Sequence, residues 1–142
     1  MAKNKLRMGY RFEVESSELG GERGRRVLKS GAIGSITGFP AFIGDYQFDF
    51  PWLSKKITGE AKHGYGGAKQ IAVKKEWYDK IQLQAKSVNM YDCVSFKFKN
   101  ACDGVTRVIS FDFETFKKIL DDIDNIYEEN TWLKEENEKL RK

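Results

Sequence analysis

The order of apolar and polar positions predicts two helices separated by strands in the first three quarters of the chain. Residues 9–19 read GYRFEVESSEL, and the apolar side formed by Phe12 and Leu19 predicts a short helix that Gly20 can end. A second, amphipathic helix is predicted over residues 73–88 from apolar residues spaced by four, four, four and three. These residues are Val73, Trp77, Ile81, Ala85 and Val88.

The segment between the two helices predicts a β-hairpin. In DYQFDF the polar residues Asp45, Gln47 and Asp49 alternate with aromatic residues, so a strand would place all three on one face. Pro51 ends this strand, SKK makes a turn, and ITGEAK returns as a second strand. Residues 41–62 are therefore expected to form a hairpin.

Two further strands are predicted after the second helix. YDCVSFKFK and VTRVISFDF both alternate, and they flank the turn-like segment NACDG. Val94, Phe96 and Phe98 are expected in the core. Strands on both sides of a helix favour an α/β fold with a mixed β-sheet flanked by helices.

The hydrophobic period changes to seven after Phe113. The d positions of this heptad register are Ile119, Ile126, Leu133 and Leu140, and the a positions are Phe116, Ile123, Asn130 and Asn137. Two g-position glutamates, Glu129 and Glu136, each precede by five residues a basic e-position residue, Lys134 or Arg141. This pattern predicts a parallel coiled coil and hence a homodimer. The alternatives are a single helix folded back on the body and a solvated, frayed end.

The length of 142 residues suits one compact body with an appendage, which we divide into residues 1–112 and 113–142. The only Cys and His residues are Cys93, Cys102 and His63, too few for a structural zinc site or a disulfide framework. The chain has no run of eighteen apolar residues and no apolar signal segment near Met1. We therefore expect a soluble cytoplasmic protein with no membrane partner.

Charge is divided unevenly along the chain. Residues 1–99 carry a net charge of +8, and residues 100–142 carry −4. A basic body of this kind is typical of proteins that bind a polyanion such as DNA, because Lys and Arg neutralise phosphates whatever the base sequence. The alternative is a basic surface that only meets solvent.

The candidate chemistry lies in the predicted hairpin. In a strand, Glu60 and Lys62 share one face, and either Asp45 or Asp49 would join them from the paired strand. Two carboxylates and a backbone carbonyl suit Mg²⁺, which prefers oxygen ligands and retains several waters. Lys62 could orient a water molecule or neutralise charge on a phosphate.

These residues carry a resemblance to a known family. GDYQFDF…ITGEAK resembles the D…ExK core of the PD-(D/E)XK nuclease superfamily. GYRFE at 9–13 and RRVLKSGA at 25–32 resemble the opening helix and the arginine-containing strand and serine loop of archaeal-type and phage Holliday junction resolvases. KKEWYDKIQLQAK and CVSFKF resemble the helix and strand that pack behind the active site of these enzymes. The similarity covers residues 9–99.

The resemblance implies a restriction-endonuclease-like fold and assigns roles to single residues. Asp45 and Glu60 would be ligands of Mg²⁺, for which Mn²⁺ could substitute, Lys62 the catalytic lysine, and Glu13 a helix acid near the metal. DNA contacts would come from four residues: Arg25, Arg26, Lys29 and Ser30.

Two departures from the family pattern keep rivals open. A glycine, Gly44, stands where the family has proline, and the interval to Glu60 is slightly long. Asp49 therefore rivals Asp45 as a ligand. Glu22 rivals Glu13, since GERGRRVL could itself be helical.

The expected function is Mg²⁺-dependent cleavage of four-way DNA junctions by paired nicks from a homodimer, in the host cytoplasm if a phage encodes the protein. One alternative is another nuclease of the same superfamily, a nickase or restriction-type enzyme, that acts on duplex DNA. The other is a non-catalytic DNA-binding adaptor that recruits partners through the coiled coil.

Overall fold

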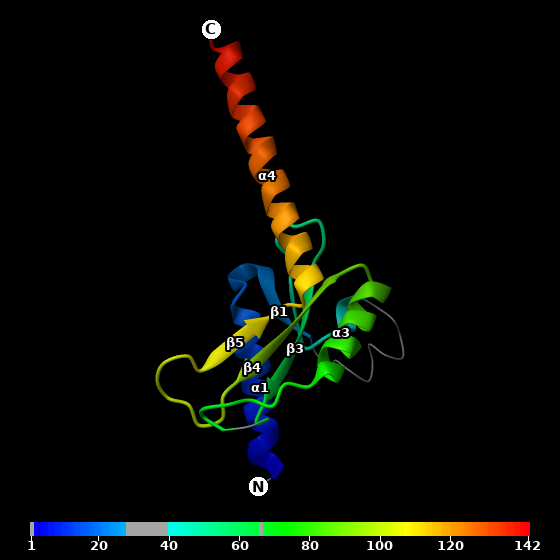
Figure 1. The fold of residues 1–142 in the computed structure, drawn as a ribbon, viewed down its shortest axis with the longest axis vertical. Helices are drawn as coiled ribbons and strands as arrows, with labels where there is room; N and C mark the ends of the chain where they lie inside the picture. The colour runs from blue at the N-terminus through cyan, green and yellow to red at the C-terminus, as the bar shows by residue number, and fades with distance from the viewer. Residues whose placement is uncertain (1, 28–39, 66) are drawn as a thin grey trace.

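The computed structural model describes residues 2–27, 40–65 and 67–142. The chain forms one five-stranded sheet with helices on both faces and a long C-terminal helix that leaves the body (Figure 1). The elements in order are α1 (Ala2–Glu18), a 3₁₀ turn (Gly21–Arg23), β1 (Gly24–Arg26), a second 3₁₀ turn (Pro40–Phe42), β2 (Tyr46–Phe48), β3 (Ile57–His63), α3 (Lys75–Ser87), β4 (Tyr91–Lys97), β5 (Arg107–Ser110) and α4 (Phe113–Leu140).

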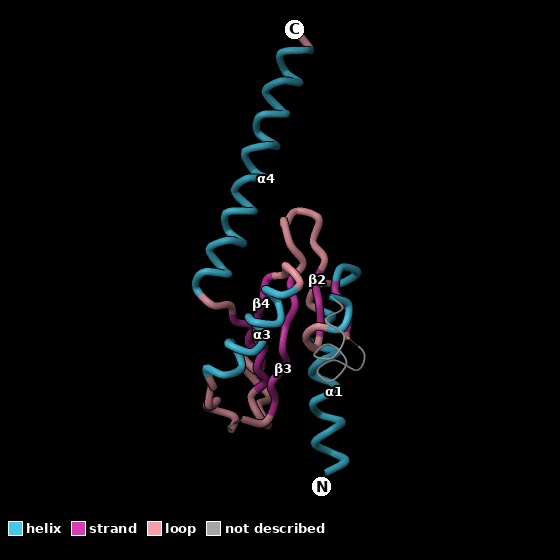
Figure 2. The backbone as a smooth tube through the Cα atoms, turned by 90° about the vertical axis from the view of Figure 1, so that its right-hand side faces the viewer, coloured by secondary structure: helices cyan, strands magenta, loops and turns pink. Residues whose placement is uncertain are grey.

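The sheet is mixed, with the spatial order β1-β2-β3-β4-β5. Only β3 and β4 pair in parallel, and α3 is the crossover between them, whereas the other neighbouring strands are antiparallel. Figure 2 shows the strands between α1 on one side and α3 on the other. The sheet therefore has an α1 face and an α3 face, and the parity of a residue in its strand decides which one it joins.

The predicted α/β fold, a mixed β-sheet flanked by helices, is confirmed. The hairpin expected over residues 41–62 is β2 and β3, and the amphipathic helix is α3. The first helix is longer than predicted, because it begins at Ala2 instead of Gly9. Most of the segment RRVLKSGA, including Lys29 and Ser30, lies outside the described residues.

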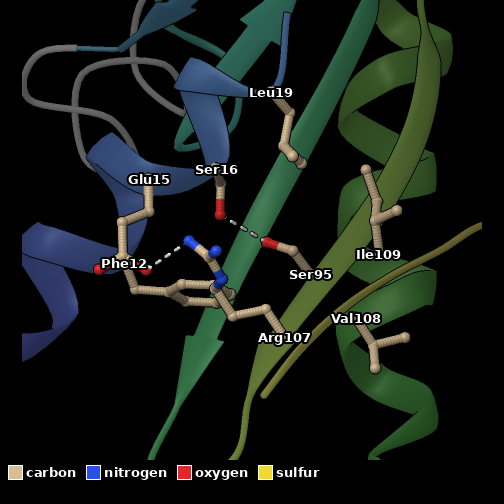
Figure 3. A pocket seen from close by; sticks show the side chains of 8 residues that line it. All are labelled: Phe12, Glu15, Ser16, Leu19, Ser95, Arg107, Val108 and Ile109. Atoms are coloured by element: carbon tan, nitrogen blue, oxygen red, sulfur yellow. Dashed lines mark hydrogen bonds and ion pairs between the residues drawn. The ribbon is translucent and has the colours of Figure 1, made fainter. Parts of the chain in front are cut away.

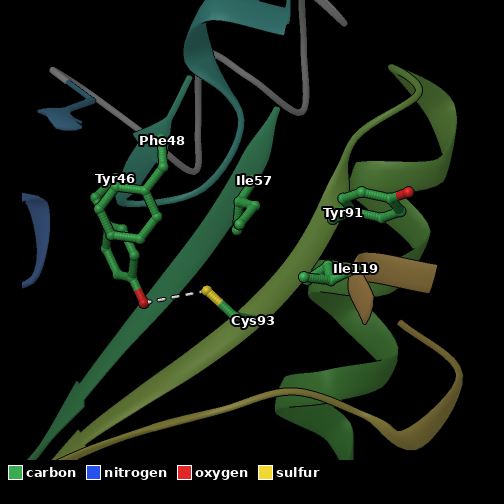
Figure 4. Packing of buried hydrophobic residues seen from close by; sticks show 6 residues of the cluster. All are labelled: Tyr46, Phe48, Ile57, Tyr91, Cys93 and Ile119. Atoms are coloured by element: carbon green, nitrogen blue, oxygen red, sulfur yellow. Dashed lines mark hydrogen bonds between the residues drawn. The ribbon is translucent and has the colours of Figure 1, made fainter. Parts of the chain in front are cut away.

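Two apolar clusters hold the body together. One joins β2, β3, β4 and α4, and its members are Tyr46, Phe48, Ile57, Tyr91, Cys93 and Ile119 (Figure 4). The other packs α3 on the sheet through Trp77, Ile81, Val94 and Phe96. Six of the seven residues of β4 are buried, because this strand is covered on both faces. Of the core residues predicted there, Val94 and Phe96 are buried and Phe98 is half-buried.

The first turns of α4 are bound to the body. Asp112 caps the helix by accepting a hydrogen bond from the amide of Thr115 at 3.0 Å, and Ile119 is buried in the first apolar cluster. One turn later, the carboxylate of Asp122 accepts hydrogen bonds from the Tyr91 hydroxyl and the Ser54 hydroxyl, both at 2.8 Å. These contacts set the direction in which the helix leaves the sheet.

The C-terminal part of α4 extends away from the body (Figures 1 and 2). Beyond Asp122 the helix carries large exposed apolar side chains. Ile123, Leu133 and Leu140 of the heptad register are 46%, 49% and 82% exposed. The predicted tail helix is therefore present, but its first d position, Ile119, packs against its own body instead of a partner. No helix in the described part of the chain is long and apolar enough to span a membrane.

A buried carboxyl group lies at the junction between β4 and α4. Asp92 is 4% exposed, and its Oδ1 accepts a hydrogen bond from the Thr115 hydroxyl at 3.2 Å. Its Oδ2 has no hydrogen-bond partner among the described residues. Burial, and then the nearby carboxylate of Asp112, raise the pKa of Asp92 to about 6.

The first prediction concerns the pH dependence of stability. A raised pKa means that the folded state holds this proton more tightly than the unfolded chain, so the stabilisation present at acid pH is lost as pH rises through about 6. We expect Asp92→Asn to increase the free energy of unfolding by ~2 kcal/mol near pH 7.5, and to leave it almost unchanged near pH 4. Urea denaturation at both pH values measures the difference.

The matched control is Asp103→Asn, which makes the same change in an exposed turn. It should have little effect at either pH. A difference between wild type and Asp92→Asn that stays constant with pH would contradict this account of the buried carboxyl group.

Candidate active site

The centre of the candidate site is an ion pair on β3. Glu60 is buried, and its Oε1 lies 2.6 Å from the Nζ of Lys62, two residues along the strand. Both side chains point to the α3 face, where the Lys62 ammonium lies 5.4 Å from the ring centroid of Trp77. The predicted placement of Glu60 and Lys62 on one face is confirmed.

A second lysine approaches the same carboxylate from α3. The Nζ of Lys80 lies 3.7 Å from Oε1 of Glu60, and the Lys80 side chain is 55% exposed, against 17% for Lys62. A buried carboxylate needs such cations, because loss of water costs it several kcal/mol unless charge partners replace the water. The cluster of Glu60, Lys62 and Lys80 carries a net positive charge.

Lys80 was missed by the sequence analysis. Its only signal is its position next to the apolar residue Ile81, at the border of the helix face that packs on the sheet. Helical spacing locates that border, but it does not say which strand residue lies opposite.

Asp45 comes directly before β2 and is joined to β3 beside Glu60. Its amide donates to the carbonyl of Gly59 at 2.7 Å, and its Oδ2 accepts the amide of Ala61 at 2.8 Å. The carboxylate of Asp45 therefore takes the place of a backbone acceptor at the end of the hairpin ladder. Asp45 thus contacts the backbone of the two residues that flank Glu60, Gly59 and Ala61.

The backbone before Asp45 has a special shape. Gly44 has φ +75°, which the ring of proline cannot adopt, and a Cβ there would lie 2.2 Å from Oγ1 of Thr58. The segment is held by Thr58, which donates to the carbonyl of Ile43 at 2.8 Å, and by the buried Gln47, which donates to the same carbonyl at 2.9 Å. This explains the glycine at the position where the resemblance would place proline.

The two rival carboxylates lie elsewhere. Asp49 follows β2 at the other end of the hairpin, where its exposed carboxylate lies 3.8 Å from the ammonium of Lys56. Glu22 lines a cavity together with Asp49 and Lys56. Within the described part of the chain, neither carboxylate pairs with Glu60 or Lys62, whereas Asp45 contacts the β3 backbone next to Glu60.

Glu13 also lies apart from the cluster. It belongs to α1, and its Oε2 pairs with Nη2 of Arg26 at 3.0 Å. Arg26 is opposite Tyr46 in the sheet and so points to the α1 face, whereas Glu60 and Lys62 point to the α3 face. The resemblance predicted Glu13 near the metal, but the sheet separates it from the cluster.

The predicted DNA-contacting arginines have partners inside the protein. Arg25 donates to the carbonyl of Ala41 at 3.2 Å and to the side-chain oxygen of Gln47. Arg26 is engaged by Glu13, and its guanidinium lies 4.1 Å from the ring centroid of Tyr10. The charge of Arg26 is therefore neutralised locally, while Arg25 remains exposed.

A different cavity, between α1 and β5, carries no comparable chemistry (Figure 3). The hydroxyls of Ser16 and Ser95 share a hydrogen bond of 3.0 Å across it, and Glu15 pairs with Arg107 at 3.2 Å. These polar groups satisfy one another. Among the described residues, this cavity therefore presents no polar group that needs a ligand as its partner.

The candidate site contains the type of donor atom that a hard cation prefers. Asp45 and Glu60 supply carboxylate oxygens, the ligands that Mg²⁺ prefers. No set of three or more His, Cys, Asp or Glu side chains arranged to hold a metal occurs among the described residues. The Lys62 ammonium lies 2.6 Å from Oε1 of Glu60, so a cation bound at that oxygen would require the ammonium to move.

Comparison with known proteins gave no match: no family model, no curated protein and no solved structure is similar to this chain at a significant level.

The second prediction tests whether Gly44 shapes the site. Gly44→Ala should lower the free energy of unfolding by about 1–3 kcal/mol, because its positive φ and the contact with Thr58 both oppose a Cβ. Gly67→Ala is the control, since a Cβ there meets no atom of the described part of the chain within 4 Å. Urea denaturation of both variants gives the comparison, and equal stability of the two would refute the role of Gly44.

Proposed function

We propose that the protein is a Mg²⁺-dependent DNA endonuclease of the Holliday junction resolvase kind. The observation that carries this proposal is the β2–β3 hairpin, which joins the Asp45 carboxylate to the strand beside Glu60 and pairs Glu60 with Lys62. An acid on one strand and an E-x-K on the next is the arrangement that the resemblance requires. The order of one helix, three antiparallel strands, a crossover helix and a parallel strand is also compatible with a restriction-endonuclease-like fold.

Asp45 and Glu60 are the residues that would hold the metal. When bound, the cation would supply positive charge next to the phosphate that is cleaved. Lys62 would then exchange its contact with Glu60 for a water molecule or a phosphate oxygen. Lys80, which is more exposed, would remain beside Glu60 and add positive charge that favours an anionic substrate.

The charge of the body supports a nucleic-acid substrate. Residues 1–99 carry a net charge of +8, and the ammonium of Lys80 on α3 lies 3.7 Å from the Glu60 carboxylate. Contacts to phosphates position DNA without reading its sequence, which suits recognition of a branched shape. Arg25 and, outside the described residues, Lys29 and Ser30 remain proposed DNA contacts.

A homodimer fits this function, because two active sites related by a two-fold axis match the near two-fold symmetry of a four-way junction. The exposed part of α4 is the proposed interface. Ile123, Ile126 and Leu133 supply apolar a and d positions beyond the body, and the asparagine at Asn130 favours a parallel register. Pairing must start after Asp122, since the preceding turns contact the sheet.

The third prediction concerns cleavage. Asp45→Asn, Glu60→Gln and Lys62→Ala should each slow cleavage of a synthetic four-way junction in Mg²⁺ by at least about 100-fold. Binding of the junction in Ca²⁺ should persist, since each variant removes one group and leaves the basic surface. Gel assays of cleavage and of binding, on the same preparations, separate the two effects.

Asp49→Asn is the matched control, because it changes an exposed carboxylate of the same hairpin that lies away from Glu60. It should cleave like wild type. Equal cleavage by wild type and all three site variants would eliminate the nuclease. Comparable cutting of linear duplex DNA would favour a nickase or restriction-type enzyme of the same superfamily.

A non-catalytic DNA-binding adaptor is the second candidate, and one observation favours it. Lys62 already neutralises Glu60 at 2.6 Å, so the buried carboxylate needs no metal for its own stability. An adaptor would bind the junction in Ca²⁺ and in Mg²⁺ without cutting it. The same cleavage assay therefore distinguishes the two functions.

The fourth prediction concerns the oligomeric state. We expect the full chain to sediment as a dimer, and Leu133→Lys, at a d position, to weaken the dimer by at least about tenfold through loss of apolar burial. Asn125→Lys adds the same charge at an outward c position and should remain dimeric. A monomeric wild type at micromolar concentration would contradict the coiled-coil interface.

A further inference from the structure

A cavity of about 380 Å³ opens at the end of β3, next to Lys62. We call it the β3-end cavity, and its lining includes Gly9, Lys62, His63, Gly64, Tyr65 and Lys99. Its volume lies within the range of small-ligand sites. Because Lys62 belongs both to this cavity and to the ion pair with Glu60, a ligand here would lie beside the candidate active site.

The cavity is electrostatically positive. Lys99 is exposed and makes no ion pair within the described ranges of the chain. Burial of the imidazole, and then the ammonium groups of Lys97 and Lys99, lower the pKa of His63, against the opposing effect of Glu15. Of the two lysines that line the cavity, Lys62 pairs with Glu60, whereas the charge of Lys99 is not neutralised by a described carboxylate, so an anion could pair with Lys99.

The wall of the cavity formed by α1 is bare. Gly9 lies inside that helix, where glycine is less favourable than alanine. A Cβ at Gly9 would meet no atom of the described residues within 4 Å, so packing within that part of the chain does not require glycine there. Gly64 is equally open on the other side, although its φ of +84° requires glycine for the turn. Both positions leave room for the close approach of a ligand.

An aromatic ring completes the cavity. Tyr65 is 39% exposed, and its ring meets that of Trp77 edge-on with centroids 4.6 Å apart. The Nζ of Lys74 lies 5.5 Å from the Tyr65 centroid. A half-exposed ring held beside lysines can contact the sugar or base of a nucleotide whose phosphate enters the positive cavity.

We propose that the β3-end cavity binds a phosphate of the DNA backbone that flanks the phosphate cleaved at Glu60 and Lys62. Lys99 and His63 contact this flanking phosphate, and Tyr65 lies against the adjoining sugar or base. The proposal rests on the function proposed above and adds a second contact that holds the strand in position across the active site.

Anisotropy titrations of the full chain with a labelled four-way junction in Ca²⁺ test the proposal. At low salt, Lys99→Ala should bind about tenfold more weakly than wild type. Between about 50 and 200 mM salt, its plot of log affinity against log salt should be shallower by about 0.9, one phosphate contact. Lys86→Ala, in the last turn of α3 at the opposite end of the sheet, is the control and should keep the wild-type slope.

A second variant fills the cavity without changing charge. Gly9→Leu should weaken binding about tenfold as well, while its melting temperature should not fall, because leucine favours a helix more than glycine does. Lys99→Arg should restore binding. If Lys99→Ala and Gly9→Leu both bind with the affinity and salt slope of wild type, the β3-end cavity is not a phosphate site.

Cleavage by wild type separates this inference from the proposed nuclease. If Lys99→Ala binds the junction more weakly and wild type does not cleave it, the cavity binds the DNA backbone but the protein is not a nuclease. If wild type cleaves the junction and both variants bind it as wild type does, the protein is a nuclease but the cavity is not a phosphate site. A wild-type chain that does not bind the junction would overturn both.

Discussion

The structure depends on a carboxylate that is buried in the middle of the sheet. Glu60 belongs to β3, the central strand, and its side chain has almost no access to water. A charge in that position destabilises the fold unless cations replace the lost solvent. Lys62 supplies the first cation from the same strand, and Lys80 approaches from α3. Packing of α3 on the sheet therefore also completes the electrostatics of the site.

The same sheet divides the charged residues into two separate systems. On the α3 face, Glu60 is shared by two lysines. On the α1 face, Glu13 pairs with Arg26, and Glu15 is shared by two basic residues, Lys97 and Arg107. The carboxylates of α1 thus stabilise the attachment of that helix. A reaction at Glu60 would draw its charged groups from β3, α3 and the residue before β2.

α4 is one continuous helix with two different parts, a first part that is packed on the body and a second part that is exposed. Its first turns are fixed to the body by apolar burial of Ile119 and by hydrogen bonds at Asp112 and Asp122. The remaining turns carry exposed apolar side chains that the body does not cover. Because the base is held at several points, the direction of the exposed part is set by the sheet, and a partner bound there would have a defined position relative to the candidate site.

Local periodicity determined much of the fold from the sequence. Alternation around Pro51 predicted the hairpin, steps of three and four predicted α3, and the two-residue spacing predicted that Glu60 and Lys62 share a face. Each of these features depends on neighbours within a few residues, which is why the printed sequence is enough to find them.

Tertiary packing decided the rest. Three contacts join residues 13 to 20 positions apart in the chain. Asp45 accepts the amide of Ala61, Lys80 approaches Glu60, and Glu13 pairs with Arg26. These contacts depend on which strands become neighbours and which face of the sheet each helix covers. The spacing of residues along the chain predicts neither. The sequence by itself determined the local elements and the side-by-side Glu60 and Lys62, whereas the folded sheet alone decided which distant charges meet them.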